Sequence, residues 1–164
     1  MIVALMGVSG CGKTTVGRAL AAELHWPLVE ADEFHPQANI AKMAAGVPLT
    51  DTDRWPWYDR LVAELRRYSL ARTDVVLACS ALKQAYRDRL AQAGDVRFVY
   101  LKGDARTIEP RLARRKGHFM PPTLLPSQFA TLEEPPDAIV VDIAQPVAAQ
   151  VAAIWCALQL PLPA

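Results

Sequence analysis

Near its start the chain reads Gly7-Val8-Ser9-Gly10-Cys11-Gly12-Lys13-Thr14, which matches the pattern G-x-x-x-x-G-K-[ST] without a gap. Glycines in such a loop let consecutive backbone N–H groups turn toward an anion, and a following helix adds its positive N-terminal end. The lysine neutralises charge on the β- and γ-phosphates, and the final hydroxyl can ligate Mg²⁺. An apolar run at 2–6 precedes the loop, and an Ala/Leu-rich segment with helical spacing follows at 15–24. The sequence therefore predicts a nucleotide-binding loop between a buried strand and a helix, with contacts from residues 7–14 and Thr15.

Apolar, strand-like runs recur along the chain and alternate with segments of helical periodicity. The runs lie at 2–6, 28–30, 74–79, 96–101 and 138–141. This alternation predicts a three-layer α/β/α fold, in which helices cover both faces of a five-stranded parallel sheet. The length of 164 residues suits a single domain over 1–164. Pro110 falls inside a helical stretch at 105–116, so we expect that helix to start late or to be kinked.

Charge and composition argue against several classes of partner. The 18 basic and 17 acidic side chains are interspersed and give a net charge of +1, so neither a nucleic-acid-binding stripe nor a polybasic membrane anchor is indicated. No apolar run approaches membrane-spanning length, and the early loop leaves no room for a removable signal peptide. The three cysteines are far apart and match no metal or disulfide pattern. We expect a cytoplasmic protein with small-molecule partners, and neither nucleic acid nor membrane among them.

The second strand-like run ends in carboxylates, at the sheet edge where open α/β sheets bind ligands. Asp32 is suited to accept a hydrogen bond from an attacking hydroxyl, and Glu30 to help Thr14 hold Mg²⁺ directly or through water. The alternative for both carboxylates is a solvated acidic turn. The third run ends at Cys79-Ser80 without an acid, so metal binding must also depend on phosphate oxygens and water. A GTPase is disfavoured because the motif N-K-x-D is absent.

Ordered blocks of residues extend over nearly the whole chain beyond the loop. They are His35-Pro36-x-x-Asn39-Ile40-x-Lys42-Met43-x-x-Gly46-x-Pro48-Leu49-x-Asp51-x-Asp53-Arg54-x-Pro56-Trp57, Cys79-Ser80-Ala81-Leu82-Lys83-x-x-Tyr86-Arg87-Asp88, Tyr100-Leu101-Lys102-Gly103, Arg115-Lys116-Gly117-His118-Phe119-Met120-Pro121 and Ser127-Gln128-Phe129-x-Thr131-Leu132-Glu133-x-Pro135. These blocks resemble the signature blocks of the thermoresistant gluconokinase family. The resemblance implies phosphorylation of D-gluconate by ATP and Mg²⁺ to 6-phospho-D-gluconate, in a P-loop NTPase fold similar to shikimate and nucleoside monophosphate kinases. It also suggests a homodimer.

Two positions depart from the family pattern. The family usually has Asp-Gly-Asp where this chain has Glu30-Ala31-Asp32, so the first carboxylate is one methylene longer and the backbone freedom of the glycine is lost. Asp32 keeps the position that the family implies for contact with the acceptor hydroxyl. Cys11 stands where the family usually has serine.

Gluconate carries a carboxylate at the end opposite the phosphorylated hydroxyl, so its pocket requires a cation far from the γ-phosphate. Arg54 is the first candidate, because its segment is similar to the one that clamps the acceptor carboxylate in shikimate kinases. The alternative for Arg54 is a salt bridge to Asp51 or Asp53. Lys83 and Arg87 are four residues apart on an expected helix, so both are candidates for the same anion. A solvated helix face is the alternative for either.

Residues 111–135 look like the lid of related kinases, which closes over the nucleotide. That resemblance implies that Arg111 stacks on adenine and that Arg115 stabilises the transferred phosphoryl group together with Lys13. His118 and Gln128 are candidates for hydrogen bonds to substrate hydroxyls when the lid closes. His35, beside Asp32, is a further candidate, although a single histidine is often structural.

The loop after the last strand resembles the loop that lines adenine in related kinases. It contains Gln145 and Pro146, whose contacts with the base are expected through the backbone. Two other functions stay open from the sequence alone. One is a kinase for another small hydroxy acid such as shikimate, and the other is a nucleotide-binding regulator with weak or no turnover.

Overall fold

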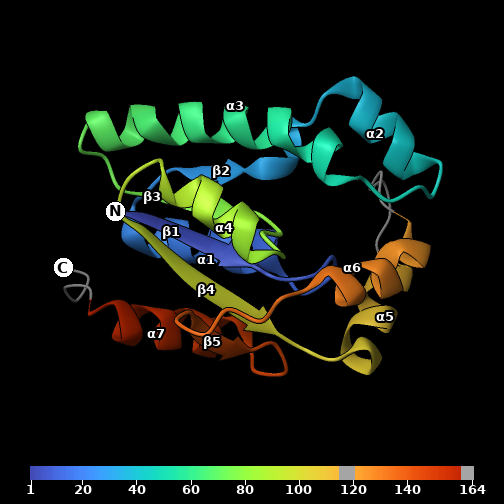
Figure 1. The fold of residues 1–164 in the computed structure, drawn as a ribbon. Helices are drawn as coiled ribbons and strands as arrows, with labels where there is room; N and C mark the ends of the chain where they lie inside the picture. The colour runs from blue at the N-terminus through green and yellow to red at the C-terminus, as the bar shows by residue number, and fades with distance from the viewer. Residues whose placement is uncertain (115–120, 160–164) are drawn as a thin grey trace.

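Five parallel strands form a single sheet in the order β2-β3-β1-β4-β5 (Figure 1). The computed structural model describes residues 1–114 and 121–159. The strands are β1 (Ile2–Met6), β2 (Leu28–Glu30), β3 (Val75–Ala78), β4 (Val96–Lys102) and β5 (Ile139–Asp142). Every strand pair is parallel, and the central strand β1 pairs with both β3 and β4. The predicted five-stranded parallel sheet is confirmed, with small shifts at the ends of β3, β4 and β5.

Helices cover both faces of this sheet and also lie beyond its carboxyl edge. They are α1 (Lys13–Leu24), η1 (Ala31–Phe34), α2 (Gln37–Ala44), α3 (Asp51–Leu70), α4 (Gln84–Ala91), α5 (Ala105–Arg114), η2 (Pro122–Leu124), α6 (Leu125–Thr131) and α7 (Val147–Leu158). In Figure 1, α2 and the pair α5–α6 lie at the end of the molecule toward which the strand arrows point. The layers are therefore α/β/α, with an additional group of helices around the sheet edge that binds ligands in such folds.

Alternation along β1 divides the core into two halves. Ile2, Ala4 and Met6 belong to a buried cluster that also contains residues of α3 and α4. Val3 and Leu5 face the opposite way, into a cluster with residues of α1, α5 and α7. Because all five residues of β1 are buried, the strand is a continuous apolar run, as expected for the centre of a doubly covered sheet.

The helix α5 begins at Ala105 and continues through Pro110 to Arg114. The side chain of Asp104 accepts a hydrogen bond from the backbone N–H of Thr107 at 2.8 Å and thereby satisfies one of the first amides of the helix. The sequence offered two alternatives, a late start or a kink, and the late start is wrong. Pro110 is exposed, so water can satisfy the carbonyl that loses its helical partner.

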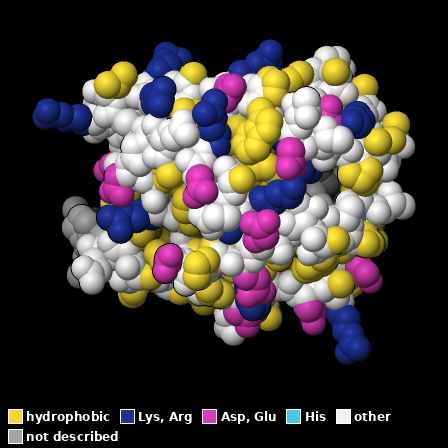
Figure 2. Space-filling model, in the orientation of Figure 1, with side chains coloured by type: hydrophobic (Ala, Val, Ile, Leu, Met, Phe, Trp, Pro, Cys, Tyr) yellow, Lys and Arg dark blue, Asp and Glu magenta, His cyan; other side chains and the backbone are white. Residues whose placement is uncertain are grey.

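Charged side chains of both signs are interspersed over the face shown in Figure 2. This mixture agrees with the near balance of acidic and basic residues in the sequence. Within residues 1–114 and 121–159, no helix combines the length and the apolar character that a membrane crossing requires.

Candidate active site

A cavity of about 650 Å³ extends from the phosphate-binding loop toward α2 and α3. The predicted site residues that line it are Ser9, Gly10, Cys11, Gly12, Lys13, Thr14, Thr15, Glu30, Asp32, His35, Arg54, Arg111, Gln128, Gln145 and Pro146. Gly7 and Val8 lie at the base of the loop, and Lys83 and Arg87 are not part of the lining. Arg115 and His118 lie outside the described residues. Residues that are far apart in the sequence thus converge on one cavity at the carboxyl edge of the sheet.

The phosphate loop closes around the side chain of Lys13. The ammonium group of Lys13 donates to the carbonyls of Gly7 and Val8 at 2.9 and 3.0 Å. Gly12 precedes α1 in a left-handed conformation, with φ of 104°, which a glycine adopts without strain. At Gly7, φ is 141° and a Cβ would come within 2.9 Å of the carbonyl oxygen of Leu101. The loop therefore requires glycine at both ends. At Gly12 the reason is the backbone conformation, and at Gly7 it is both the conformation and the lack of space for a side chain.

Gln128 contacts the phosphate loop directly. The side-chain oxygen of Gln128, on α6, accepts the backbone N–H of Ser9 at 2.6 Å, and both residues are buried. A buried amide without a partner would cost about 1–3 kcal/mol, so this bond stabilises the loop conformation. The sequence predicts Gln128 as a substrate ligand, and the structure places it in the cavity lining but also gives it this loop contact.

Thr14 and Glu30 form a pair that fits Mg²⁺. The Thr14 hydroxyl donates to Glu30 Oε2 at 3.0 Å. The other carboxylate oxygen, Oε1, is buried and has no hydrogen-bond partner among the described residues. Burial raises the pKa of Glu30, against the hydrogen bond from Thr14 and the positive charge of Arg18. A divalent cation would supply the partner that the buried carboxylate lacks, together with Thr14, phosphate oxygens and water.

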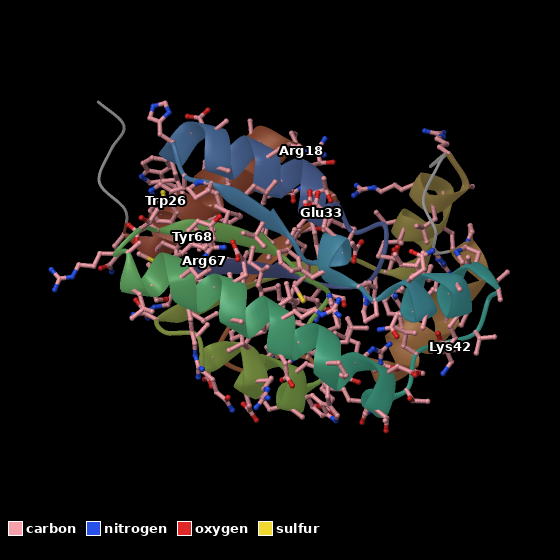
Figure 3. All side chains as sticks on the ribbon, turned by 90° about the horizontal axis from the view of Figure 1, so that it is seen from above. Arg18, Trp26, Glu33, Lys42, Arg67 and Tyr68 are labelled. Atoms are coloured by element: carbon pink, nitrogen blue, oxygen red, sulfur yellow. The ribbon has the colours of Figure 1, made fainter. Side chains whose placement is uncertain are left out.

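Other acidic groups add little to this candidate metal site. Within the described part of the chain, no cluster of three or more His, Cys, Asp or Glu side chains could hold a metal ion. Arg18 on α1 and Glu33 on η1, labelled in Figure 3, both influence the charge of Glu30. The arrangement is therefore typical of Mg²⁺ held mainly by a nucleotide and few protein ligands.

Asp32 and His35 belong to the short η1 helix and its C-cap. Asp32 is exposed and lines the cavity. His35 is buried and stacks on Trp57, with ring centroids 3.9 Å apart. Burial lowers the pKa of His35 from 6.5 to about 4, although the negative charge of Asp32 opposes this shift. His35 is therefore neutral at pH 7 and supplies no positive charge for an anionic substrate.

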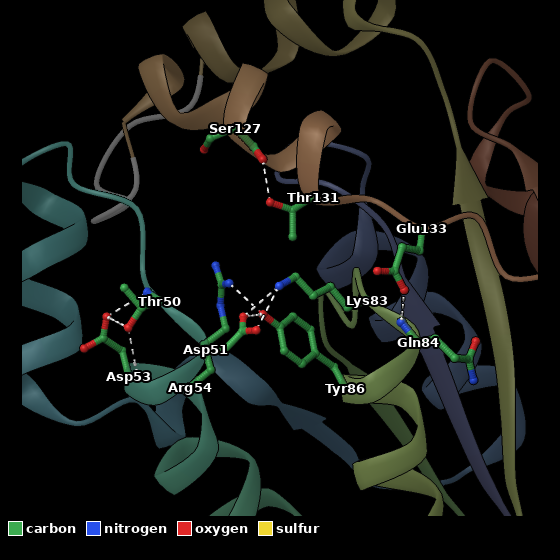
Figure 4. A network of polar contacts seen from close by, with 10 residues as sticks. All are labelled: Thr50, Asp51, Asp53, Arg54, Lys83, Gln84, Tyr86, Ser127, Thr131 and Glu133. Carbon is green, nitrogen blue, oxygen red and sulfur yellow. Dashed lines mark hydrogen bonds and ion pairs between the residues drawn. The ribbon is translucent and has the colours of Figure 1, made fainter.

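The aspartates beside Arg54 have other partners. Asp53 forms an ion pair with Lys42 and hydrogen bonds with Thr50, and these contacts lower the pKa of Asp53 to about 2. The contacts with Thr50 form a capping box at the start of α3 (Figure 4). The ammonium group of Lys83 donates to both carboxylate oxygens of Asp51, at 2.9 Å each. Arg54 donates to the hydroxyl of Tyr86 at 3.0 Å and forms no ion pair with either aspartate. The alternative salt bridge for Arg54 is therefore not present.

Lys83 and Arg87 do not face the same cleft, contrary to the prediction. Lys83 has extended backbone angles because it is the N-cap of α4, so the helical spacing of four residues does not apply to it. Arg87 is 3% exposed and donates to the carbonyls of Ala81 and Leu82. Arg87 thus stabilises the turn after β3, whereas Lys83 pairs with Asp51 near Arg54.

One end of the cavity, where the sequence predicts the nucleotide base, lies between α5 and the loop after β5. Arg111 donates to the carbonyl oxygen of Ile143 at 2.8 Å, which holds its guanidinium beside this loop. Gln150 is buried on α7 and donates to the carbonyl of Gln145 at 2.7 Å. These two hydrogen bonds hold the loop after β5 against α5 and α7, and Gln145 and Pro146 of this loop line the cavity.

Several lining residues were not predicted from the sequence. They are Val16, Arg18, Met43, Leu49, Trp57, Ala78, Ser80, Leu82, Tyr86, Ile143, Val147 and Gln150. Most of them are buried apolar or aromatic residues, and such residues usually belong to a core. A signal was present for Tyr86, because it stands in the same quoted block as Lys83 and Arg87.

Comparison with known proteins gives consistent matches over most of the chain. An AAA domain family model matches residues 2–135. A gluconokinase from Gluconobacter oxydans (strain 621H) is 50% identical over 136 residues, which are 81% of this chain and 75% of that protein. The thermoresistant gluconokinase of Escherichia coli (strain K12) is 46% identical over 158 residues, 92% of this chain and 89% of that protein.

Solved structures agree with these sequence matches. An unliganded sugar kinase from Janibacter sp. HTCC2649 superposes with a TM-score of 0.91 at 44% identity, covering 97% of this chain and 94% of that one. A shikimate kinase from Bacteroides thetaiotaomicron has a TM-score of 0.69 at 15% identity, covering 98% of this chain and 99% of that one. The second likeness shows the fold alone and confirms the predicted kinase-type P-loop fold.

Proposed function

The chain belongs to the gluconokinase family, and on this premise we propose that it transfers the γ-phosphoryl group of ATP to the 6-hydroxyl of D-gluconate. The products are 6-phospho-D-gluconate and ADP. The observation that carries the proposal is a single cavity that contains a phosphate loop, a carboxylate for the attacking hydroxyl and an arginine beyond it. Donor, acceptor hydroxyl and acceptor carboxylate can therefore be bound in the same cavity.

Phosphoryl transfer through a loose transition state depends mainly on positioning and on charge stabilisation. Lys13 needs only to move from the carbonyls of Gly7 and Val8 to reach phosphate oxygens at the loop. Thr14 and Glu30 would hold Mg²⁺, which when bound neutralises charge on the β- and γ-phosphates. Asp32 orients the 6-hydroxyl and accepts its proton as the new bond forms.

The acceptor carboxylate binds to Arg54, whose guanidinium can form two parallel hydrogen bonds with it. His35 is neutral at pH 7, and Lys83 is paired with Asp51, so Arg54 supplies the positive charge at this end. Gln128 links the loop to α6 and also lines the cavity, where we place it near the substrate polyol. Arg87 has no part in binding, because its donors are bonded to the turn after β3.

The nucleotide base binds between Arg111 and the loop at Gln145-Pro146, both of which line the same end of the cavity. Arg115 and His118 retain the roles that the family resemblance implies, charge stabilisation of the transferred group for Arg115 and a substrate contact for His118. Residues 111–135 act as a lid, which expels water when it closes.

The test is ADP release by the purified protein with Mg·ATP, comparing D-gluconate with shikimate and with no acceptor. Release that requires D-gluconate and is lost in Asp32→Ala is the expected result. The matched control is Glu33→Ala, which removes the exposed neighbouring carboxylate outside the cavity lining. Release with shikimate alone would refute the substrate, and nucleotide binding without acceptor-dependent turnover would indicate a regulator.

A further inference from the structure

Tyr86 connects Arg54 to an ion pair at the rim of the cavity (Figure 4). Its hydroxyl accepts from Arg54 Nη1 at 3.0 Å and donates to Asp51, which Lys83 also contacts. Tyr86 is 2% exposed, and its ring packs against Tyr58 and Trp55. The hydroxyl therefore has a fixed position that does not depend on substrate.

The donor and the acceptor of each hydrogen bond between Arg54, Tyr86 and Asp51 follow from the chemistry of the three side chains. Asp51 is a carboxylate and Lys83 an ammonium group, so Tyr86 must donate its proton to Asp51. Burial raises the pKa of Tyr86, and the contact with Asp51 acts in the same direction, so the proton remains on the hydroxyl at pH 7. The oxygen of Tyr86 then has only lone pairs left, and it can only accept from Arg54.

Among Arg54, Lys83 and Asp51, one positive charge, that of Arg54, has no neutralising partner. Lys83 and Asp51 neutralise each other, with side chains 32% and 47% exposed. The guanidinium centre of Arg54 lies 5.4 Å from the centroid of the Tyr86 ring. A guanidinium has five N–H donors, and within the described residues Arg54 uses one, toward Tyr86. A net charge of one suits an acceptor with a single carboxylate.

We infer that Tyr86 is a positioning residue for recognition of the acceptor carboxylate: held by Asp51, it fixes the Arg54 guanidinium so that its remaining donors face the cavity. This inference rests on the proposed function and extends it from Arg54 to the group that orients Arg54. Lys83 acts on the substrate through Asp51 and Tyr86, instead of binding the anion itself.

The experiment measures steady-state kinetics of Tyr86→Phe, which removes the hydroxyl and keeps the ring. We expect the KM for D-gluconate to rise about tenfold, the range for losing a hydrogen bond to a charged group, while the KM for ATP and kcat change less than about twofold. The dissociation constant for D-gluconate, measured by calorimetry, should rise in parallel. The matched control is Tyr100→Phe. The hydroxyl that this variant removes contacts Glu134, and neither residue lines the cavity.

A double-mutant cycle separates positioning from a general structural role. If Tyr86 acts through Arg54, Tyr86→Phe should change kcat/KM for D-gluconate by less than about twofold in an Arg54→Ala background. Independent, multiplicative losses would overturn the inference, as would an equal rise in the KM for ATP.

A second variant keeps the test decisive if Tyr86→Phe folds poorly. Asp51→Ala removes the acceptor that fixes the Tyr86 proton, and a rise of about threefold in the KM for D-gluconate is expected. An unchanged KM would overturn the inference. Wild-type protein without gluconate-dependent turnover would instead refute the proposed function, so the two failures are distinguishable.

Discussion

Protonation of His35 should destabilise the folded protein as the pH falls. The pKa of this imidazole is about 4 in the folded chain because of burial, against 6.5 for an ordinary histidine. Between these two values the unfolded chain binds a proton that the folded chain does not, so the free energy of unfolding rises with pH in this window. The contribution of neutral His35 is complete above pH 6.5 and is lost as the pH falls toward 4.

The size of the effect follows from the gap between the two pKa values. Each pKa unit corresponds to about 1.4 kcal/mol, so the full loss is about 3 kcal/mol below pH 4. At pH 5 the unfolded imidazole is almost fully protonated and the folded one mostly neutral, so the free energy of unfolding should be about 2 kcal/mol lower than at pH 8. The 9% exposure of His35 and its stacking on Trp57 support a shift of this direction.

The assay is guanidinium chloride unfolding at pH 8 and pH 5, followed by tryptophan fluorescence. Other groups also titrate in this range, so the decisive quantity is the pH difference in wild type minus that in His35→Gln, which cannot titrate. We expect this subtraction to give about 2 kcal/mol. The control is His25→Gln at the exposed C-cap of α1, which should leave the pH difference within about 0.5 kcal/mol of wild type.

One result would refute the reasoning. If His35→Gln and wild type lose the same free energy of unfolding between pH 8 and pH 5, His35 titrates alike in the folded and unfolded chains. The imidazole would then be charged near pH 6 in the site, and Arg54 would not be alone in attracting the acceptor carboxylate.

Three further perturbations test the loop and the metal site. Gly7→Ala should lower the free energy of unfolding by about 2–4 kcal/mol and abolish ATP binding in a nucleotide titration, whereas Gly46→Ala, also at positive φ but with no atom within 4 Å, should cost about 1 kcal/mol. Glu30→Gln should raise the Mg²⁺ concentration for half-maximal turnover about tenfold or more, while Glu33→Gln, which removes only a neighbouring charge, should change it less than about twofold; equal Mg²⁺ dependence in both would contradict the candidate site. Gln128→Leu leaves a buried loop amide without its acceptor, so denaturant unfolding should show a loss of about 1–3 kcal/mol, and an unaltered midpoint would contradict this.

The strands and the phosphate loop were predictable because their signals are local. β1 is an uninterrupted apolar run, and the loop that follows it has glycines at the positions where the backbone adopts positive φ. A buried parallel strand requires such a run on both faces, and a phosphate loop requires such glycines. No long-range information is needed for either feature.

The orientation of charged side chains around the acceptor end depends on long-range contacts. The spacing of Lys83 and Arg87 predicts a shared helix face, but Lys83 precedes the helix, and a segment 32 residues away supplies its partner Asp51. The bond between Gln128 and Ser9 spans 119 residues. Periodicity carries no information about pairs at such separation, so the sequence could name these residues without giving their contacts.

The family resemblance implies Asp-Gly where this chain has Glu30-Ala31, and this difference raises the question of whether the candidate metal site is intact. Glu30 is one methylene longer than aspartate, yet one carboxylate oxygen reaches the Thr14 hydroxyl at 3.0 Å and the other stays buried without a described partner. Ala31 is not among the residues with positive φ, so its backbone does not need glycine, and its carbonyl accepts from Trp57 at 2.8 Å. Because Trp57 also stacks on His35, the substituted segment is held against the same aromatic ring that shapes the acceptor end. Glu30 and Asp32 therefore both line the cavity despite the substitution, with Glu30 at the candidate metal site, which favours an active kinase over a nucleotide-binding regulator.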